Sequence, residues 1–309
     1  MLFEHLLGNE PIKAYLRKAI ESQRLPHALL FAGPSGVGKS LFAKQLSSQL
    51  LQTTYHRIDT ENHPDFHPIR AESKSGLHSI DTLRCLIDEV HSAPFEAFGK
   101  VFLIYDAERM QTASANAILK TLEEPNPDTT LILLTEHANE ILPTIRSRCV
   151  YLPFKPIPEE EISTFLKSKG HPEHFVKRSH GSLGRALELM GKPGLEQSLF
   201  PLLSQKQSYP KLLLQLEKIE ALIEDEDPVK KNQNGEYLLT ALLMWYRDQH
   251  ARRVGVAPQA LFFPEEGVSS SLPTMERVFK TVEEARLSLQ RNIKFSVCME
   301  NVINNLYYF

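Results

Sequence analysis

The sequence is poor in cysteine: it has three, widely spaced, and none forms a Cys-x-x-Cys pair. An odd number of separated cysteines makes no disulfide framework and no cysteine zinc site, so we expect reduced thiols. No apolar run approaches the ~20 residues that a bilayer span requires. The N-terminus lacks the basic start and long apolar core of a signal peptide. We therefore expect a soluble, cytoplasmic protein that contacts no membrane.

Net charge is also small. The formal charge of −3 at pH 7 gives no global basic field, so strong non-specific DNA binding by the isolated chain is not expected. Any contact with nucleic acid has to be local or shared with partner proteins. The 309 residues suffice for two or three domains, each with its own core.

Apolar runs alternate with helical patterns in the first half of the chain. A parallel sheet covered by helices on both faces gives this alternation, since its strands are buried on both sides. The predicted strands are 28–31, 101–104, 129–136 and 149–154. The predicted helices between them are 39–52, 79–94 and 113–124.

Helical periodicity dominates after residue 154, and no buried-strand run returns. The pattern predicts an α/β domain over 1–154, a small helical domain over 155–204 and a helical domain over 205–309. The acidic and polar stretch 224–236 is typical of a surface loop.

The stretch "GPSGVGKS" has the spacing of a phosphate loop, G-x-x-x-x-G-K-[ST], between a predicted strand and a predicted helix. Its glycines let backbone amides turn toward phosphate oxygens, and the lysine adds a positive charge at the β- and γ-phosphates. The serine can ligate Mg²⁺, and the N-terminus of the helix favours an anion. We expect ATP or ADP with Mg²⁺ here. The candidate residues are Gly33, Pro34, Ser35, Gly36, Val37, Gly38, Lys39 and Ser40.

Further stretches carry a family resemblance. "NAILKTLEEP" and "LPTIRSRC" resemble the AAA+ clamp-loader subunits of bacterial DNA polymerase III, and "HPDF" and "DAERM" are similar to the delta prime group of that family. The resemblance is dense over about residues 3–154, weaker through "SHGSLGRAL" and thin beyond it. It implies a RecA-like nucleotide domain, a helical lid and a helical collar.

In that family, five subunits form an open ring that loads the sliding clamp onto primed DNA. The resemblance therefore implies gamma/tau- and delta-type subunits as direct partners, and the clamp and primer–template DNA as indirect ones. It also implies roles for single residues. Thr135 matches sensor 1, which feels the γ-phosphate, and Arg185 lies near the position of sensor 2. Arg148, in "SRC", matches the arginine finger that reaches the nucleotide of the next subunit.

The sequence departs from the family pattern in its metal ligands. Family members commonly carry a four-cysteine zinc module before "HPDF", whereas the corresponding stretch here has no cysteine. His56, His63 and His67 lie nearby, but tetrahedral zinc needs further ligands. We therefore expect loop histidines and no zinc site.

The adjacent Asp-Glu pair of the motor subunits is also altered. In one register, Tyr105 replaces the metal-side Asp and Asp106 takes the Glu position. In the other, Asp106 is the metal-side carboxylate and Ala107 replaces the Glu. Glu108 points to the opposite side of an extended segment from Ala107, so it is no simple substitute. Both registers lose one carboxylate, so we expect nucleotide binding with slow hydrolysis or none.

Two other functions are consistent with a phosphate loop. A gamma/tau-type motor ATPase would have the intact Asp-Glu pair and, usually, the zinc module. A small-molecule kinase would have basic residues in a lid that closes over the acceptor, whereas the second half of this chain has helical packing patterns. The delta prime type of clamp-loader subunit fits these observations best.

Overall fold

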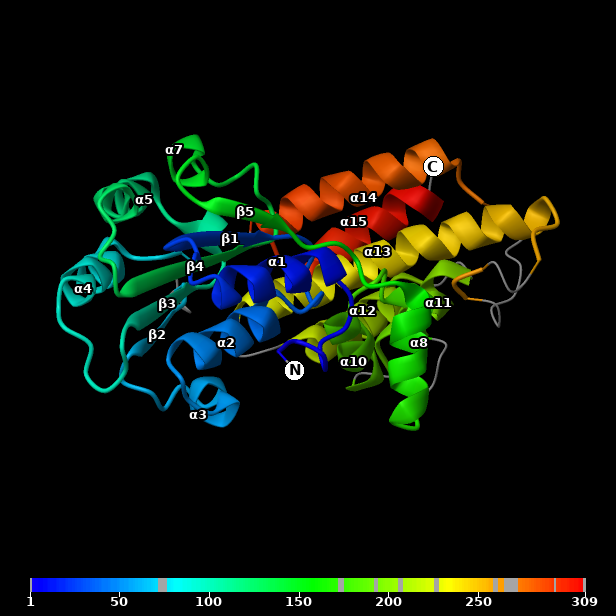
Figure 1. Ribbon diagram of the computed structural model, residues 1–309. Coiled ribbons are helices and arrows are strands. Elements are labelled where there is room, and N and C mark those ends of the chain that lie inside the picture. The colour runs from blue at the N-terminus through cyan, green and yellow to red at the C-terminus, as the bar shows by residue number, and fades with distance from the viewer. Residues whose placement is uncertain are drawn as a thin grey trace. The chain divides into compact units, whose positions relative to one another are not determined.

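The computed structural model describes residues 2–71, 77–171, 175–191, 194–204, 208–224, 228–257, 261–263, 272–291 and 293–307. The chain divides into two compact units, Met1–Glu188 and Leu189–Phe309, and Figure 1 labels most of their helices and strands. The three domains predicted from the sequence remain a prediction. Of the helices that follow residue 154, those over 159–168 and 175–178 lie entirely within the first unit.

The first unit is built on one parallel sheet of five strands in the order β2-β3-β4-β1-β5. The strands are β1 Ala28–Ala32, β2 Phe66–Ile69, β3 Lys100–Ile104, β4 Thr129–Thr135 and β5 Val150–Pro153. This sheet confirms the predicted α/β fold and the four predicted strands. The fifth strand, β2, lies within the "HPDFHPIR" stretch, for which the sequence predicted no strand.

Helices cover both faces of the sheet (Figure 1). Along β1, Leu29 and Phe31 pack with one group of helices, whereas Leu30 packs with the other, because successive side chains of a strand point to opposite faces. The first group is α1 Glu10–Glu21, α2 Lys39–Leu50 and α3 Tyr55–Asp59. The second group is α4 Ile80–Val90, α5 Thr112–Ala117, α6 Leu119–Glu123 and α7 Pro143–Arg146.

The helix predicted over 113–124 is instead the two short helices α5 and α6. Ile118, between them, is fully buried and has ψ near zero, which interrupts the regular helix. The carbonyl oxygen of Ile118 still accepts a hydrogen bond from the N–H of Leu122 at 3.0 Å. The interruption therefore places Glu123 at the end of a separate short helix.

The "HPDF" stretch organises the loop before β3. The carboxylate of Asp65 is fully buried and accepts hydrogen bonds from the N–H groups of Phe95 at 2.5 Å, Glu96 at 2.9 Å and Ala97 at 2.8 Å. Burial alone would raise the pKa of Asp65, but these three bonds outweigh it, and the pKa is lowered. The motif thus fixes the path of the chain into β3.

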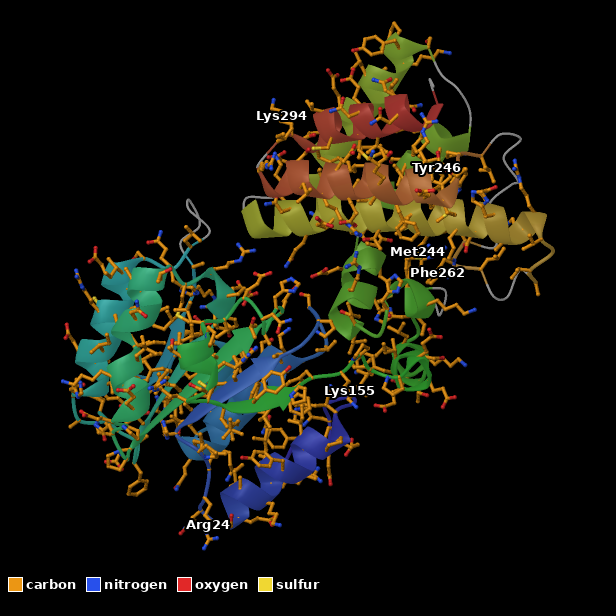
Figure 2. The ribbon with its side chains drawn as sticks, turned by 90° about the horizontal axis from the view of Figure 1, so that it is seen from above. Arg24, Lys155, Met244, Tyr246, Phe262 and Lys294 are labelled. Carbon is orange, nitrogen blue, oxygen red and sulfur yellow. The ribbon has the colours of Figure 1, made fainter. Side chains whose placement is uncertain are left out.

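The segment that follows β5 is tied to the N-terminal segment. The N–H of Lys155, which Figure 2 labels, donates to Oδ1 of Asn9 at 2.8 Å, and the N–H of Gly8 donates to the Glu161 carboxylate at 2.8 Å. The N–H of Ile157 bonds to the carbonyl oxygen of Gly181 at 2.8 Å. The helices here are α8 Glu159–Ser168, α9 Phe175–Arg178 and α10 Leu183–Gly191. The bond to Gly181 ties the residues just before α10 to the segment that follows β5.

The described residues of the second unit form helices and their connecting segments, and no strand. It contains α11 Gly194–Ser204, α12 Tyr209–Ile223, α13 Pro228–Arg253, α14 Met275–Gln290 and α15 Phe295–Tyr307. Tyr246 is buried on α13, and Phe262 lies beside the same helix (Figure 2), where its N–H bonds to the buried carboxylate of Asp248 at 2.6 Å. No helix in the described ranges is long and apolar enough to cross a membrane.

The expectation of a surface loop over 224–236 is wrong from residue 228 onward, where α13 begins. Residues 225–227 lie outside the described residues. Gly235 lets this part of α13 pack closely against its neighbours, because a Cβ at this position would lie 2.9 Å from Leu289 and 3.1 Å from Phe295. The amide of Asn234 also donates to the carbonyl oxygen of Ile223 at 3.1 Å, at the end of α12.

Candidate nucleotide-binding site

The phosphate loop connects β1 to α2 at the carboxyl edge of the sheet. Gly36 and Gly38 have φ angles of 69° and 99°, a conformation that L side chains rarely adopt. Val37 between them is fully buried and anchors the loop, whereas Pro34 and Ser35 are exposed. Ser40 is half-buried in the first turn of α2, a 12-residue helix whose N-terminus follows the loop directly.

Lys39 points back into the loop. Its side-chain Nζ donates hydrogen bonds to the carbonyl oxygens of Gly33 at 2.5 Å and Pro34 at 2.8 Å. Burial lowers the pKa of Lys39, and the negative charges of Glu136, Glu108 and Asp106 oppose this lowering. The ammonium group therefore lies within the phosphate loop, and the negative charges of three carboxylates favour its protonated form.

The prediction that residues 106–108 are extended is wrong. Asp106 adopts a left-handed conformation with φ 46°, which Asp tolerates better than most residues, and a 3₁₀ turn, η1 Ala107–Arg109, follows it. One carboxylate oxygen of Glu108 accepts a hydrogen bond from the N–H of Glu136 at 3.3 Å, just past the end of β4. Glu108 thus turns toward β4 and the charge of Lys39, an approach that the sequence did not predict.

Asp106 is half-buried, and burial is the main cause that raises the pKa of its carboxyl group. Tyr105 precedes it, directly after β3. Burial raises the pKa of the Tyr105 phenol to about 12, so it stays neutral at physiological pH. The guanidinium of Arg70 lies 4.4 Å from the centre of its ring. The residue before Asp106 is therefore a neutral tyrosine whose ring packs against the guanidinium of Arg70.

Thr135 ends β4 next to the phosphate loop. The side chain is buried, and its Oγ1 accepts a hydrogen bond from the N–H of His137 at 3.1 Å. Its carbonyl oxygen accepts a hydrogen bond from the N–H of Gly33 at 3.1 Å. The structure therefore brings Thr135, Lys39 and Asp106 to the same edge of the sheet.

The start of α10 contacts the outer side of the loop. The N–H of Gly184 donates to the carbonyl oxygen of Gly36 at 3.1 Å, and a Cβ on Gly36 would lie 2.1 Å from the hydroxyl of Ser182. The N–H of Arg185 bonds to that hydroxyl at 3.1 Å, and the Arg185 side chain is half-buried. Gly184, which the sequence did not single out, is thus the α10 residue whose backbone bonds to the loop.

Arg148 lies at the opposite end of the strands, where their amino termini are. It precedes β5, whereas the phosphate loop follows the end of β1, and the two strands are parallel neighbours. Its Nη1 donates to the carbonyl oxygen of Thr144 at 2.9 Å, and its Nη2 forms an ion pair with Glu123. Arg148 and Lys39 are therefore separated by the length of a strand, ~3.3 Å per residue.

The three histidines lie in different settings. His56 is on α3 and His67 is on β2, so only His63 fits the prediction of loop histidines. His63 is buried, and its Nε2 lies 3.1 Å from the carboxylate of Glu96. His67 stacks on Phe102 with ring centres 4.6 Å apart. Within the described part of the chain, no three His, Cys, Asp or Glu residues are placed to hold a metal ion.

Comparison with known proteins finds that this chain is similar to subunits of DNA polymerase III. Residues 8–158 match the family described as "DNA polymerase III, delta subunit". The chain is 26% identical to DNA polymerase III subunit delta' of Bacillus subtilis (strain 168), in an alignment that covers 93% of each chain. It is 34% identical to subunit gamma/tau of Mycoplasma genitalium, over 61% of this chain and 35% of that protein.

A solved structure of a gamma subunit-related protein from Thermotoga maritima has the same fold. Its TM-score is 0.55 at 16% identity, and the alignment covers 95% of this chain and 96% of that one. At this identity, the likeness shows the fold alone. Together with the sheet order and the phosphate loop, these matches show that residues 8–158 of this chain are similar to the DNA polymerase III delta-subunit family.

Proposed function

We propose that this protein is the delta prime-type subunit of a bacterial clamp loader. It assembles in the cytoplasm with gamma/tau- and delta-type subunits in a five-membered ring that places the sliding clamp on primer–template DNA. The observation that carries this proposal is the separation of Lys39 and Arg148 at opposite ends of the strands. The chain has a phosphate loop at the carboxyl ends of its strands and an arginine at their amino ends. This arrangement suits a ring in which the arginine of one subunit contacts the nucleotide bound to its neighbour.

The residues of the phosphate loop fit the phosphates of ATP or ADP. Gly36 and Gly38 leave backbone amides unshielded, α2 directs its N-terminus at the loop, and Lys39 supplies a buried positive charge. The carbonyl contacts of Lys39 are ones that it can exchange for phosphate oxygens. Ser40 and Asp106 would hold Mg²⁺, whose charge offsets that of the phosphates. Thr135 and Arg185 would contact the nucleotide from β4 and α10.

The arrangement beside Asp106 supports retention of the nucleotide without rapid hydrolysis. Hydrolysis requires one carboxylate at the metal and another that orients the attacking water. Tyr105 is neutral, with its pKa raised to about 12 by burial, and Ala107 has no polar group. On either side of Asp106, the second carboxylate is therefore missing. The bound nucleotide would then stabilise the first unit by linkage.

One observation favours a second candidate, a gamma/tau-type ATPase. The turn at Asp106 brings the Glu108 carboxylate to the end of β4, where its charge acts on Lys39. A carboxylate in this place could orient water in the role that Ala107 cannot fill. Glu108 is thus the residue on which the two candidates make different predictions.

Steady-state ATP turnover by the purified chain distinguishes the two candidates. We expect a rate far below the ~10 s⁻¹ of a typical enzyme, the same in the wild type and in Glu108→Gln. Glu140→Gln, which changes an exposed carboxylate in the same domain, is the matched control. Turnover near that typical rate that is lost in both Glu108→Gln and Lys39→Ala would instead establish an active ATPase.

A further inference from the structure

The ion pair between Arg148 and Glu123 joins two short helices. Glu123 is the last residue of α6, and Arg148 lies two residues beyond the end of α7. Both side chains are partly exposed, Arg148 by 34% and Glu123 by 51%. Exposed ion pairs of this kind contribute little to stability, so the fold alone gives little reason for the contact.

The contacts of Arg148 hold the guanidinium from one side. Nη1 donates to the carbonyl oxygen of Thr144 at 2.9 Å and to the hydroxyl of Ser147 at 3.4 Å, and Nη2 donates to Glu123. Among the described residues, Nε makes no hydrogen bond. Nε and Nη2 lie on one edge of the planar guanidinium, and Nη2 has a second N–H besides the one that Glu123 accepts. This edge can therefore offer two donors to two oxygens of one phosphate group.

We propose that Glu123 is a positioning residue for Arg148, which it holds ready to contact the terminal phosphate of a nucleoside triphosphate on a neighbouring subunit. This inference rests on the proposed function of Arg148 as a finger in trans. An unrestrained arginine has many rotamers, and fixing its plane before the neighbour docks leaves less freedom to lose on engagement. Glu123 and Thr144 together restrain it from two helices while the edge of Nε and Nη2 remains accessible.

The test uses the complete clamp loader, assembled from this chain and its partner subunits. The Arg148-dependent turnover is the ATPase rate of the wild-type ring minus that of the Arg148→Ala ring. Glu123→Ala should lower this quantity about tenfold or more, through kcat with KM unchanged. Glu123→Gln keeps an acceptor oxygen and should fall between Glu123→Ala and wild type. Glu124→Ala, which removes the adjacent exposed carboxylate, should match wild type.

A double substitution separates positioning from a structural role. In the Arg148→Ala background, Glu123→Ala should change the turnover no further, because it acts through Arg148. An equal loss in that background, a faster Glu123→Ala ring, or a Glu123→Ala ring equal to Glu124→Ala would each refute the positioning role. If Arg148→Ala itself leaves turnover unchanged, the finger in trans fails instead. The melting temperature of each variant and the mass of each ring confirm folding and assembly.

Discussion

Replacing Arg148 with alanine is expected to slow ATP hydrolysis at the adjacent subunit's site by a factor of ~10³–10⁵, the range known for arginine fingers in other phosphoryl-transfer systems. A guanidinium stabilises the charge that develops on the transferred phosphoryl group, and alanine supplies none. The ATPase rate of the whole ring should therefore fall by the amount that the adjacent subunit's site contributes. Nucleotide binding by this chain should not change, because Arg148 lies at the opposite end of the strands from the phosphate loop.

Two variants sharpen the Arg148 prediction. Arg148→Lys keeps a positive charge but not the planar edge with two donors, so its rate should fall between those of wild type and Arg148→Ala. Arg146→Ala removes an exposed arginine two residues earlier, whose Nη1 lies 3.4 Å from the side chain of Asn139, and should have no effect. Equal rates in the wild-type and Arg148→Ala rings, with both fully assembled, would exclude the finger.

Lys39→Ala is expected to abolish the thermal stabilisation that nucleotide gives the isolated chain. At a nucleotide concentration of 100 times Kd, binding to the native state contributes about 2.7 kcal/mol. For a unit of about 190 residues, this corresponds to a rise in Tm of roughly 5–11 °C. Without the ammonium group, the cradle loses the charge that faces the phosphates. Thermal melts with and without ATP and Mg²⁺ measure the difference.

Lys44→Ala is the matched control for Lys39→Ala. Lys44 lies on the same helix, but its side chain pairs with Asp59 at 2.8 Å and takes no part in the loop. The control should retain the full nucleotide shift. Lys39→Ala without nucleotide should melt close to the wild type, because burial already opposes the charge of Lys39, as its lowered pKa shows. A full nucleotide shift in Lys39→Ala would contradict the proposed cradle.

Strand β2 shows why part of the sheet could not be predicted. Buried runs such as "VFLI" identify the central strands, because both faces of those strands are covered. β2 reads "FHPI", with a proline that cannot donate a ladder hydrogen bond, a pattern that argues against a central strand. It is tolerated because β2 is at the edge of the sheet and pairs with β3 alone. The first turns of α13 were predicted as a loop for a related reason: they are polar.

The candidate site could be predicted where local spacing determines geometry. The phosphate loop was predicted from its spacing between a strand and a helix, and Thr135 from the family resemblance; the structure places both at strand ends. Glu108 could not be placed, because a single left-handed residue, Asp106, reverses the direction of its side chain. The pairing of Glu123 with Arg148 joins residues 25 positions apart through two short helices, one of them created by the interruption at Ile118. No local pattern carries that information.

Helix α12 carries an apolar stripe, Leu212, Leu213, Leu216 and Ile219, which the sequence pattern of the helical domain over 205–309 would predict to contact other subunits. Leu212, Leu216 and Ile219 are buried within the second unit, so they form its own core. Leu213, which belongs to the same run in the sequence, is 37% exposed, and Leu214 is 55% exposed. The buried stripe therefore gives no support for a contact between subunits, and the exposed leucines are the α12 residues available for one.

The measurement that tests the central claim most directly is the native mass of the assembly formed when this chain is mixed with purified gamma/tau- and delta-type subunits, with and without ATP. We predict one complex of five subunits that contains a single copy of this chain, with the same composition in the Lys39→Ala variant. A chain that stays monomeric beside subunits that assemble without it, or that forms a ring only with copies of itself, would contradict the assignment as a clamp-loader subunit of the delta prime type.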